Sequence, residues 1–311
     1  MIGHPACYGE YCKRVDEKRL SMENIMFEDT SQDVEALAEF VSRHRRLFVL
    51  TGAGVSTDCG IPDYRDARGD WKRPPPVSHQ AFMGSHGVRQ RYWARSLVGF
   101  RALAAAHPGK AHAALTALER QSRITSLVTQ NVDGLHQRAG ARRVIGLHGQ
   151  ADVVKCMNCD ATLMRHALHD ELARRNPEWL SLSAEVGPDG DADLDGYDFS
   201  TFDVPSCHRC RVGVFKPDVV FFGDNVPRAR VEQAFQALEE ASGILVVGSS
   251  LMVYSGFRFA RQAAKLGKPI ACVNLGKTRA DALFDLKVTA PIGPTLTALI
   301  DALEPLQRLA R

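Results

Sequence analysis

Residues 47–56 read Leu47-Phe48-Val49-Leu50-Thr51-Gly52-Ala53-Gly54-Val55-Ser56, and the expected architecture starts from this stretch. Its four leading apolar residues predict a buried strand, and the glycines that follow predict a tight turn able to open a helix. Glycine lets a backbone approach a pyrophosphate closely, and a helix N-terminus favours the negative charge. The stretch lacks the third glycine of the dinucleotide fingerprint, so taken alone it also fits an ordinary strand–helix turn.

Apolar runs and amphipathic helix patterns alternate along most of the chain. The spacing of apolar residues predicts helices at 32–44, 110–120, 231–238, 256–266 and 296–303. Further apolar runs predict strands at 124–128, 143–147, 218–222, 244–247, 269–273 and 285–290. Because strands alternate with helices, we expect a parallel sheet that is covered by helices on both faces.

Two stretches interrupt this alternation. Residues 62–100 contain a proline triplet and many charges, and residues 150–215 contain paired cysteines. We therefore expect an α/β fold in which a Rossmann-like parallel-sheet domain carries a smaller inserted zinc-and-helix domain. The expected bounds are approximately 31–61, 101–149 and 216–311 for the large domain, approximately 62–100 and 150–215 for the small domain, and 1–30 for a leader expected to be disordered.

The composition excludes several classes of protein. The 311 residues are 45% apolar and 24% charged, which excludes a disordered, collagen-like or coiled-coil chain. No apolar run approaches the ~20 residues that a membrane helix needs, so no membrane partner is expected. A net charge of +3 is too small to indicate a nucleic-acid surface. The first 30 residues mix acids with bases, unlike a signal or transit peptide, and this favours a cytoplasmic location.

Four of the eight cysteines form two pairs with CxxC spacing, namely Cys156, Cys159, Cys207 and Cys210. Zinc takes four thiolates in a tetrahedron, and each CxxC turn supplies two of them. The pairs therefore predict one structural zinc, with no open position for catalysis. A redox pair is less favoured because neither CxxC begins a helix after a strand. A nucleic-acid-binding ribbon is less favoured because the segment between the pairs is acidic.

An acidic segment lies between the two cysteine pairs. Asp191, Asp193, Asp195 and Gly196 match the first positions of an EF-hand calcium loop. The twelfth position, which should hold a bidentate glutamate, is Phe202. We therefore expect a solvated acidic loop, with weak calcium binding as the alternative.

Polar motifs follow the predicted strands in a fixed order. They occupy residues 51–65, 129–136, 147–149, 216–224, 247–250 and 274–276. The carboxyl ends of parallel strands meet at one edge of a sheet, so these motifs predict a crevice there. From about residue 32 to 303 the ordered set resembles the sirtuins, which are NAD-dependent protein-lysine deacylases. The stretch at 89–95 and the context of Leu147-His148-Gly149 resemble the class II branch, which includes the mitochondrial lipoamidase-type sirtuin and its bacterial relatives.

The resemblance implies a role for each motif. His148 is expected to be the general base, since imidazole can accept a proton from a ribose hydroxyl near neutral pH, and Asn131 is the second expected catalytic residue. The implied NAD-binding residues are Gly52, Ala53, Gly54, Ser56, Asp63, Tyr64, Arg65, Gln130, Asn131, Asp133, Gly248, Ser249, Ser250, Asn274, Leu275, Gly276 and Ile292. The implied substrate residues are Tyr92, Arg95, Val220, Phe222, Gly223, Val253 and Tyr254.

The implied activity is deacylation of acylated-lysine proteins or peptides, with NAD as cofactor and nicotinamide and O-acyl-ADP-ribose as products. The peptide is expected to add as a strand between loops at 222–224 and 253–255. Mono-ADP-ribosyl transfer is the alternative within the family. A hydride-transferring dehydrogenase and a non-enzymatic zinc module are the alternatives outside it.

One pair of side chains is relevant to which acyl group the enzyme would accept. Tyr92 and Arg95 lie three residues apart on a predicted helix and so share a face. They match the pair with which desuccinylating sirtuins bind an acyl carboxylate, and both can donate hydrogen bonds to one. The hypothesis is that Arg95 contacts the far end of a long or acidic acyl chain. The alternative is a surface pair on a cationic helix. The sequence predicts neither a single acyl group nor an oligomeric state.

Overall fold

The structure is a computed structural model that describes residues 31–309, with side chains described up to residue 303. The predicted leader at 1–30 lies outside the described residues. A six-stranded parallel sheet has the order β3-β2-β1-β7-β8-β9. Its strands are β1 (Leu47–Thr51), β2 (Ile124–Thr129), β3 (Val144–Gly146), β7 (Gly243–Val247), β8 (Ile270–Val273) and β9 (Leu286–Val288). The chain winds outward from β1 and then outward from β7, which is the predicted Rossmann-like arrangement.

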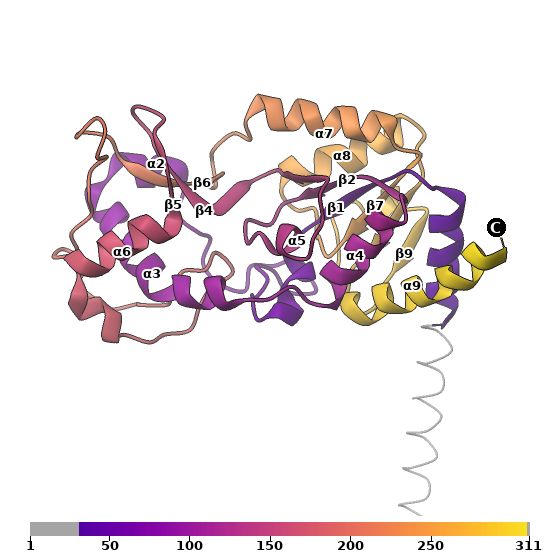
Figure 1. The fold of residues 1–311 in the computed structure, drawn as a ribbon, viewed down its shortest axis with the longest axis horizontal. Helices are drawn as coiled ribbons and strands as arrows, with labels where there is room; N and C mark the ends of the chain where they lie inside the picture. Colours follow the sequence, from indigo (N-terminus) through magenta and orange to yellow (C-terminus); the bar gives the residue numbers. More distant parts are fainter. Residues whose placement is uncertain (1–30, 310–311) are drawn as a thin grey trace, which may run out of the picture.

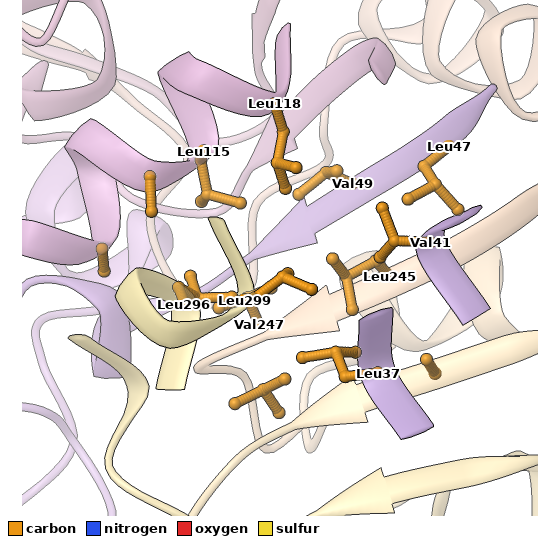
Figure 2. Close-up of a cluster of buried hydrophobic side chains, with 14 of the residues drawn as sticks. Leu37, Val41, Leu47, Val49, Leu115, Leu118, Leu245, Val247, Leu296 and Leu299 are labelled. Carbon is orange, nitrogen blue, oxygen red and sulfur yellow. The ribbon is translucent and has the colours of Figure 1, made fainter. Parts of the chain in front are cut away.

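The two faces of this sheet bury alternate residues of the same strands. Leu47 and Val49 of β1 belong to one buried cluster, and Phe48 and Leu50 belong to the other. The first cluster is covered by the helix at 31–43, by α4 (Lys110–Arg120) and by α9 (Ile292–Leu309). Figure 2 shows this cluster, in which Leu115 and Leu118 of α4 reach down towards Val49. Helices α7 (Arg228–Glu240) and α8 (Tyr254–Lys265) cover the other face (Figure 1).

A second, antiparallel sheet has the order β5-β4-β6 and lies beside the parallel sheet (Figure 1). Its strands are β4 (Gly149–Cys156), β5 (Thr162–Met164) and β6 (Phe215–Val219). The helices around it are α2 (His79–Gly84), α3 (His86–Ala105), α6 (Arg165–Arg175) and η3 (Pro177–Ser181). Trp93, Leu97 and Leu168 are among the buried residues of their common core. We call this sheet with its four helices the small module.

Two local expectations differ from the structure. The apolar run at 218–222 was expected to add a strand to the parallel sheet. Instead, the strand β6 lies at Phe215–Val219 and pairs with β4, which the sequence analysis did not predict. The glycine turn after β1 opens no α-helix, because two short 3₁₀ helices follow it, at Ala53–Val55 and Thr57–Cys59. The remaining short helices are α5 (Leu135–Arg138) and η4 (Asp281–Leu283).

Strand β4 follows directly after β3 of the parallel sheet and makes a close backbone contact with β6 of its own sheet. It begins at Gly149, where φ is +89° and where an added Cβ would lie 1.8 Å from the Asp218 carbonyl oxygen. Only glycine fits both the backbone angle and the space. The backbone N–H of Val220 donates to the carbonyl of His148 at 2.8 Å. The residue before β4 is therefore held at the junction of the two sheets.

Within the described part of the chain, no helix combines the length and the apolar character needed to cross a membrane.

Replacing Leu115 by alanine tests the core that supports the parallel sheet. Leu115 is fully buried between α4 and the sheet, so Leu115→Ala removes apolar contacts and leaves a cavity. We expect the free energy of unfolding, measured by urea denaturation, to fall by about 2–5 kcal/mol. Leu266→Ala is the matched control, because Leu266 is 46% exposed and its loss should cost about 0.5 kcal/mol or less. Equal losses in the two variants would contradict this description of the core.

Candidate active site

The carboxyl ends of the parallel strands border a cavity of about 860 Å³, and the small module forms its far wall. The residues predicted for cofactor, catalysis and substrate all line this cavity, with the single exception of Arg95. Strand ends that lie far apart in the sequence therefore meet at one site, at the point where the winding of the sheet reverses direction.

Two strand-end turns touch each other in the floor of the cavity. An added Cβ on Gly52 would lie 2.8 Å from the Ser249 Cβ and 2.9 Å from the Gly248 carbonyl oxygen. An added Cβ on Gly54 would lie 3.0 Å from the Gly248 Cα. Gly248 itself has φ +60°, in the left-handed region that favours glycine. These glycines let the turns after β1 and β7 pack backbone to backbone, and they leave a smooth cradle of the kind a phosphate group can approach.

The polar residues after β2 form one hydrogen-bonded network. Ser56 donates to Asp133 Oδ2 at 2.7 Å and accepts from Asn131 Nδ2 at 3.1 Å. Gln130 Nε2 donates to Ser249 Oγ at 2.6 Å, which connects the β2 loop to the β7 turn. The other oxygen of Asp133 accepts the backbone N–H of Leu135 at 2.8 Å. The side chains that the sequence assigned to a ribose and amide pocket are thus held in fixed positions within the cavity wall.

The imidazole of His148 is held at both ring nitrogens. Nδ1 lies 2.9 Å from the Gln130 carbonyl, which can only accept, so Nδ1 carries the proton. Nε2 lies 2.8 Å from Ser255 Oγ and accepts from it. Burial, aided by the positive charges of Arg258 and Arg230, lowers the pKa of His148 to about 4. The imidazole is therefore neutral at neutral pH, and the lone pair of Nε2 accepts the hydrogen bond from Ser255.

The loop at 63–72 closes another side of the cavity. Asp63 forms an ion pair with Lys72, and Arg65 Nη1 donates to the Gly69 carbonyl at 2.7 Å. The guanidinium of Arg65 lies 3.9 Å from the centre of the Trp71 ring. Lys72 and Trp71 line the cavity too, but no sequence motif marked them.

The turn after β8 completes the row of strand ends. Asn274 Nδ2 donates to the Gly276 carbonyl at 2.9 Å, and an added Cβ on Gly276 would lie 3.0 Å from Ala67. Leu275 is 57% exposed at the mouth of the cavity. Val253, which also lines the cavity, precedes α8, whose first turn begins with Tyr254 and Ser255. This segment is therefore a helix start and not the loop expected at 253–255.

The two residues of the expected acyl pair lie in different surroundings. Tyr92 lines the cavity within a group of aromatic rings that includes Phe82 and Phe221. Arg95 lies beside the cavity, outside its wall, and its Nε donates to the Ala192 carbonyl at 2.8 Å. Another arginine, Arg165 at the start of α6, takes a place in the wall. No motif pointed to Arg165, because a single arginine in a polar helix matches no sequence pattern.

The acidic segment is not the solvated loop that was expected. Asp191 is 2% exposed, and Phe202 is buried in the core of the small module. The segment lies against α3 at Gly99, where an added Cβ would meet the Gly190 carbonyl oxygen at 2.2 Å. Asp193 and Asp195 do face solvent, where they pair with arginines on the surface. The carboxylates therefore point in different directions.

Two histidines that the sequence analysis did not assign to a function lie under the site. His136 is joined to Thr51 Oγ1 by a hydrogen bond of 3.0 Å, and its ring centre lies 4.7 Å from that of His112. His112 Nδ1 accepts the backbone N–H of Gly109 at 3.3 Å, which places it at the start of α4. Neither ring lines the cavity, and His136 contacts Thr51, the last residue of β1.

The four paired cysteines come together as predicted. Their Sγ atoms all lie within 4.8 Å of one another, with Cys156 and Cys210 at 3.8 Å and Cys159 and Cys207 at 3.7 Å. The two turns have the same form, because each places the residue after its second cysteine at positive φ, with 58° at Asp160 and 67° at Arg211. Gly213 lies so close that an added Cβ would meet Cys156 Sγ at 2.2 Å. Four convergent thiols in a closed shell fit a structural zinc ion.

Comparisons with known proteins agree with this geometry. The Sir2 family model matches residues 52–255. The chain is 57% identical over 276 residues to an NAD-dependent protein deacetylase of Xanthomonas campestris, over 89% of this chain and 94% of that one. It is 58% identical to NAD-dependent protein deacetylase 2 of Bradyrhizobium diazoefficiens, over 82% and 93%. It is 42% identical to NAD-dependent protein deacylase Sirt4 of Drosophila melanogaster, over 86% and 87%.

Solved structures give the same result for the fold. A Sir2 protein with a p53 peptide and NAD+ superposes with a TM-score of 0.69 at 28% identity, over 86% of this chain and 97% of that one. A Sir2 homolog in complex with NAD superposes with a TM-score of 0.67 at 28% identity, over 88% and 94%.

A doubly wound sheet with a cavity at its strand ends and a four-cysteine module on one side defines an NAD-type α/β enzyme fold. The chain belongs to the Sir2 family. Its relatives include bacterial deacetylases and a Sirt4-type deacylase, in agreement with the class II resemblance.

Removing one cysteine tests the metal site. Cys207→Ser takes away one of four thiolates, and the small module loses the bonds that join its two turns. We expect metal analysis to fall from about one zinc per chain to near zero, with a lower unfolding temperature. Cys59→Ser is the control, since Cys59 lies outside the cluster, and it should retain the metal. A Cys207→Ser protein that keeps stoichiometric zinc would contradict the assignment.

Proposed function

We infer that this protein is an NAD-dependent protein-lysine deacylase that removes acyl groups from acylated-lysine proteins or peptides. The observation that supports this most directly is the neutral, doubly hydrogen-bonded His148 in the wall of a strand-end cavity. Relatives at 57% and 42% identity bear the names NAD-dependent protein deacetylase and deacylase.

The residues of the cavity fit NAD. We propose that the Gly52–Gly54 and Gly248–Ser249 turns receive its pyrophosphate, because their backbones are bare of side-chain bulk. Asn274, at the end of β8, has the hydrogen-bonding groups to contact a ribose hydroxyl. Asp63 and the linked Asn131 and Asp133 supply donors and acceptors for the nicotinamide half. When bound, NAD supplies an electrophilic ribose carbon that can take the acyl oxygen as nicotinamide leaves.

The chain's own part in the reaction is to move a proton and to exclude water. His148 Nε2 accepts a proton from a hydroxyl presented in the cavity, and Ser255 gives way as the competing donor to that nitrogen. The Gln130 carbonyl holds the Nδ1 proton, so the ring is kept in the tautomer that has its base on Nε2. The aromatic rings of Tyr92, Phe221 and Phe222 line the route to the acyl group and keep it apolar.

A groove with two defined sides is available for the acylated peptide. The Phe222 carbonyl accepts from His79, and the Gly223 carbonyl accepts from Gln80, so α2 anchors this side of the groove. Val253 and Tyr254 form the opposite side. We propose that the peptide backbone lies extended between the two. Mono-ADP-ribosyl transfer would use the same cavity, and it differs only in what attacks the ribose.

The proposed activity is tested with an acetyl-lysine peptide, NAD and mass detection of products. We expect free lysine peptide, nicotinamide and O-acetyl-ADP-ribose in equal amounts. His148→Ala should lower turnover by about 10²- to 10⁴-fold, the usual cost of losing a general base, while NAD binding measured by calorimetry is retained. Formation of NADH would indicate a dehydrogenase, and ADP-ribosylated protein without free lysine would indicate the transferase. Near-normal turnover by His148→Ala would overturn the role of the histidine.

The pH profile tests the electrostatics of the same ring. A histidine acts as a base only while neutral, so lowering its pKa from the ordinary 6.5 to about 4 keeps it active as the pH falls through 6.5. We expect the acid limb of kcat/KM to lie below pH 6.5. Arg258→Met removes a positive charge that favours the neutral ring, so the limb should move to higher pH. The control Lys265→Met, on the exposed end of α8, should leave the limb in place. An acid limb unmoved by Arg258→Met would show that this charge does not act on His148.

A further inference from the structure

The segment from residue 241 to residue 280 carries positive charges and no negative ones. It contains six lysines and arginines and no aspartate or glutamate, whereas the whole chain has 39 basic and 36 acidic residues. The segment includes α8 and the turn after β8, and several of its residues line the cavity. Positive charge is therefore concentrated on one side of the site, in a chain whose charges nearly balance.

Three arginines of this segment gather around the start of α8. Arg261 Nη2 donates to the Tyr254 hydroxyl, and the Arg261 guanidinium lies 5.2 Å from the centre of the Tyr254 ring. The Arg258 guanidinium lies 5.1 Å from the same ring centre. Arg279 Nη1 donates to the Met252 carbonyl at 3.2 Å. We call Arg258, Arg261 and Arg279 the arginine cluster, and it flanks the side of the peptide groove that Val253 and Tyr254 form.

The arginine cluster is held in place by aromatic rings and remains accessible. Tyr254, Arg258 and Arg261 are spaced by four and three residues, so they share one face of α8. The Arg279 guanidinium lies 4.5 Å from the centre of the Phe257 ring. A guanidinium stacked on a ring loses less side-chain freedom when it binds an anion. Because Arg261 and Arg279 are exposed, a carboxylate from outside can reach them.

The arginine cluster has no counterion of its own. Among residues 31–303, none of its members forms an ion pair with a carboxylate. The acids on the opposite side of the groove are already engaged. Asp218 pairs with Arg230 at 2.6 Å, and Asp224 Oδ2 lies 3.2 Å from His79 Nδ1. An anion that binds the cluster would also relieve the repulsion between its like charges.

The position of the arginine cluster fits the peptide better than it fits NAD. Arg261 and Arg279 do not line the cavity, whose floor we assign to the NAD pyrophosphate. They hold the segment along which the peptide backbone is proposed to lie. An extended peptide advances about 3.3 Å per residue, so the residues next to the acyl-lysine pass beside Tyr254.

We propose that the arginine cluster recognises the sequence around the acylated lysine by binding a carboxylate side chain of the substrate. The preferred substrates then carry an aspartate or glutamate within about three residues of the acyl-lysine. This inference rests on the proposed deacylase function. It concerns the peptide chain and is independent of the acyl group.

The test uses acetyl-lysine peptides of one sequence that carry aspartate, asparagine or lysine at one flanking position at a time. Aspartate and asparagine match in shape and differ in charge. We expect the wild-type kcat/KM to favour aspartate over asparagine by about 2- to 5-fold at one position or more, the size typical of exposed ion pairs, and to be lowest for lysine. The preference should fall towards 1 in about 0.5 M NaCl, because salt screens exposed charges.

Variants assign the preference to the arginine cluster. Arg261→Gln and Arg279→Gln should each lower the aspartate-to-asparagine ratio, and the double variant should bring it to about 1. Arg261→Lys keeps the charge and should retain most of the ratio. Arg261→Glu should turn the preference towards the lysine peptide. Lys265→Gln is the matched control, because it removes a charge from the exposed face of α8 about one turn farther from Tyr254, and it should leave the ratio unchanged.

Other outcomes overturn the proposal. A wild-type ratio of 1 at every flanking position would do so, as would a ratio that persists in the double variant. A higher KM for NAD with an unchanged peptide ratio would show that the cluster acts on the cofactor. Peptide binding measured by fluorescence anisotropy separates these results from failure of the deacylase function. If no acetyl-lysine peptide is turned over, the deacylase function fails, while the difference in Kd between aspartate and asparagine peptides still decides the role of the cluster.

Discussion

The contact between the two strand-end turns after β1 and β7 forms the floor of the site, and the other groups of the site are arranged around it. Gly52 and Gly54 after β1 lie against Gly248 after β7, at distances that no side chain allows. This contact lies at the point where the winding of the sheet reverses, between the ends of β2 and β8. The Gln130 amide then bridges from the β2 loop to Ser249. The cavity is therefore a consequence of backbone packing, and the polar side chains are arranged around a floor that is already in place.

Burial does more for His148 than position it. The desolvation that would make a charged imidazole costly leaves the neutral ring favoured, and two nearby arginines act in the same direction. The Gln130 carbonyl selects the tautomer. Preparing a base at neutral pH thus needs no carboxylate partner here.

The periodic parts of this fold could be predicted from sequence, and the reasons are physical. Buried parallel strands such as β1 and β7 are continuous apolar runs, and strand-end motifs carry glycine where backbones touch, so the cavity residues were found by their order. The four cysteines were found because ligand spacing is local. Strand β4 was missed because Gly149–Cys156 mixes polar and apolar residues without a clear alternation, although it is the central strand of the second sheet. Asp191 and Arg165 were misjudged or missed because burial of a lone charged residue depends on which distant segments cover it, and no local pattern records that.

Strand β4 connects the cavity at the parallel sheet with the four-cysteine cluster of the small module. One end of this strand is Cys156 of the four-cysteine cluster, and its other end, Gly149, directly follows His148. Pairing with β6 allows many registers in principle, and a slip of one residue would turn every side chain of β4 to the opposite face. Thiolates from both cysteine turns that coordinate a single ion would allow only one register of β4 against β6. A metal site at one end of β4, although it takes no part in the reaction, can therefore fix the register of the strand. The register in turn determines where the His148 imidazole enters the cavity at the other end.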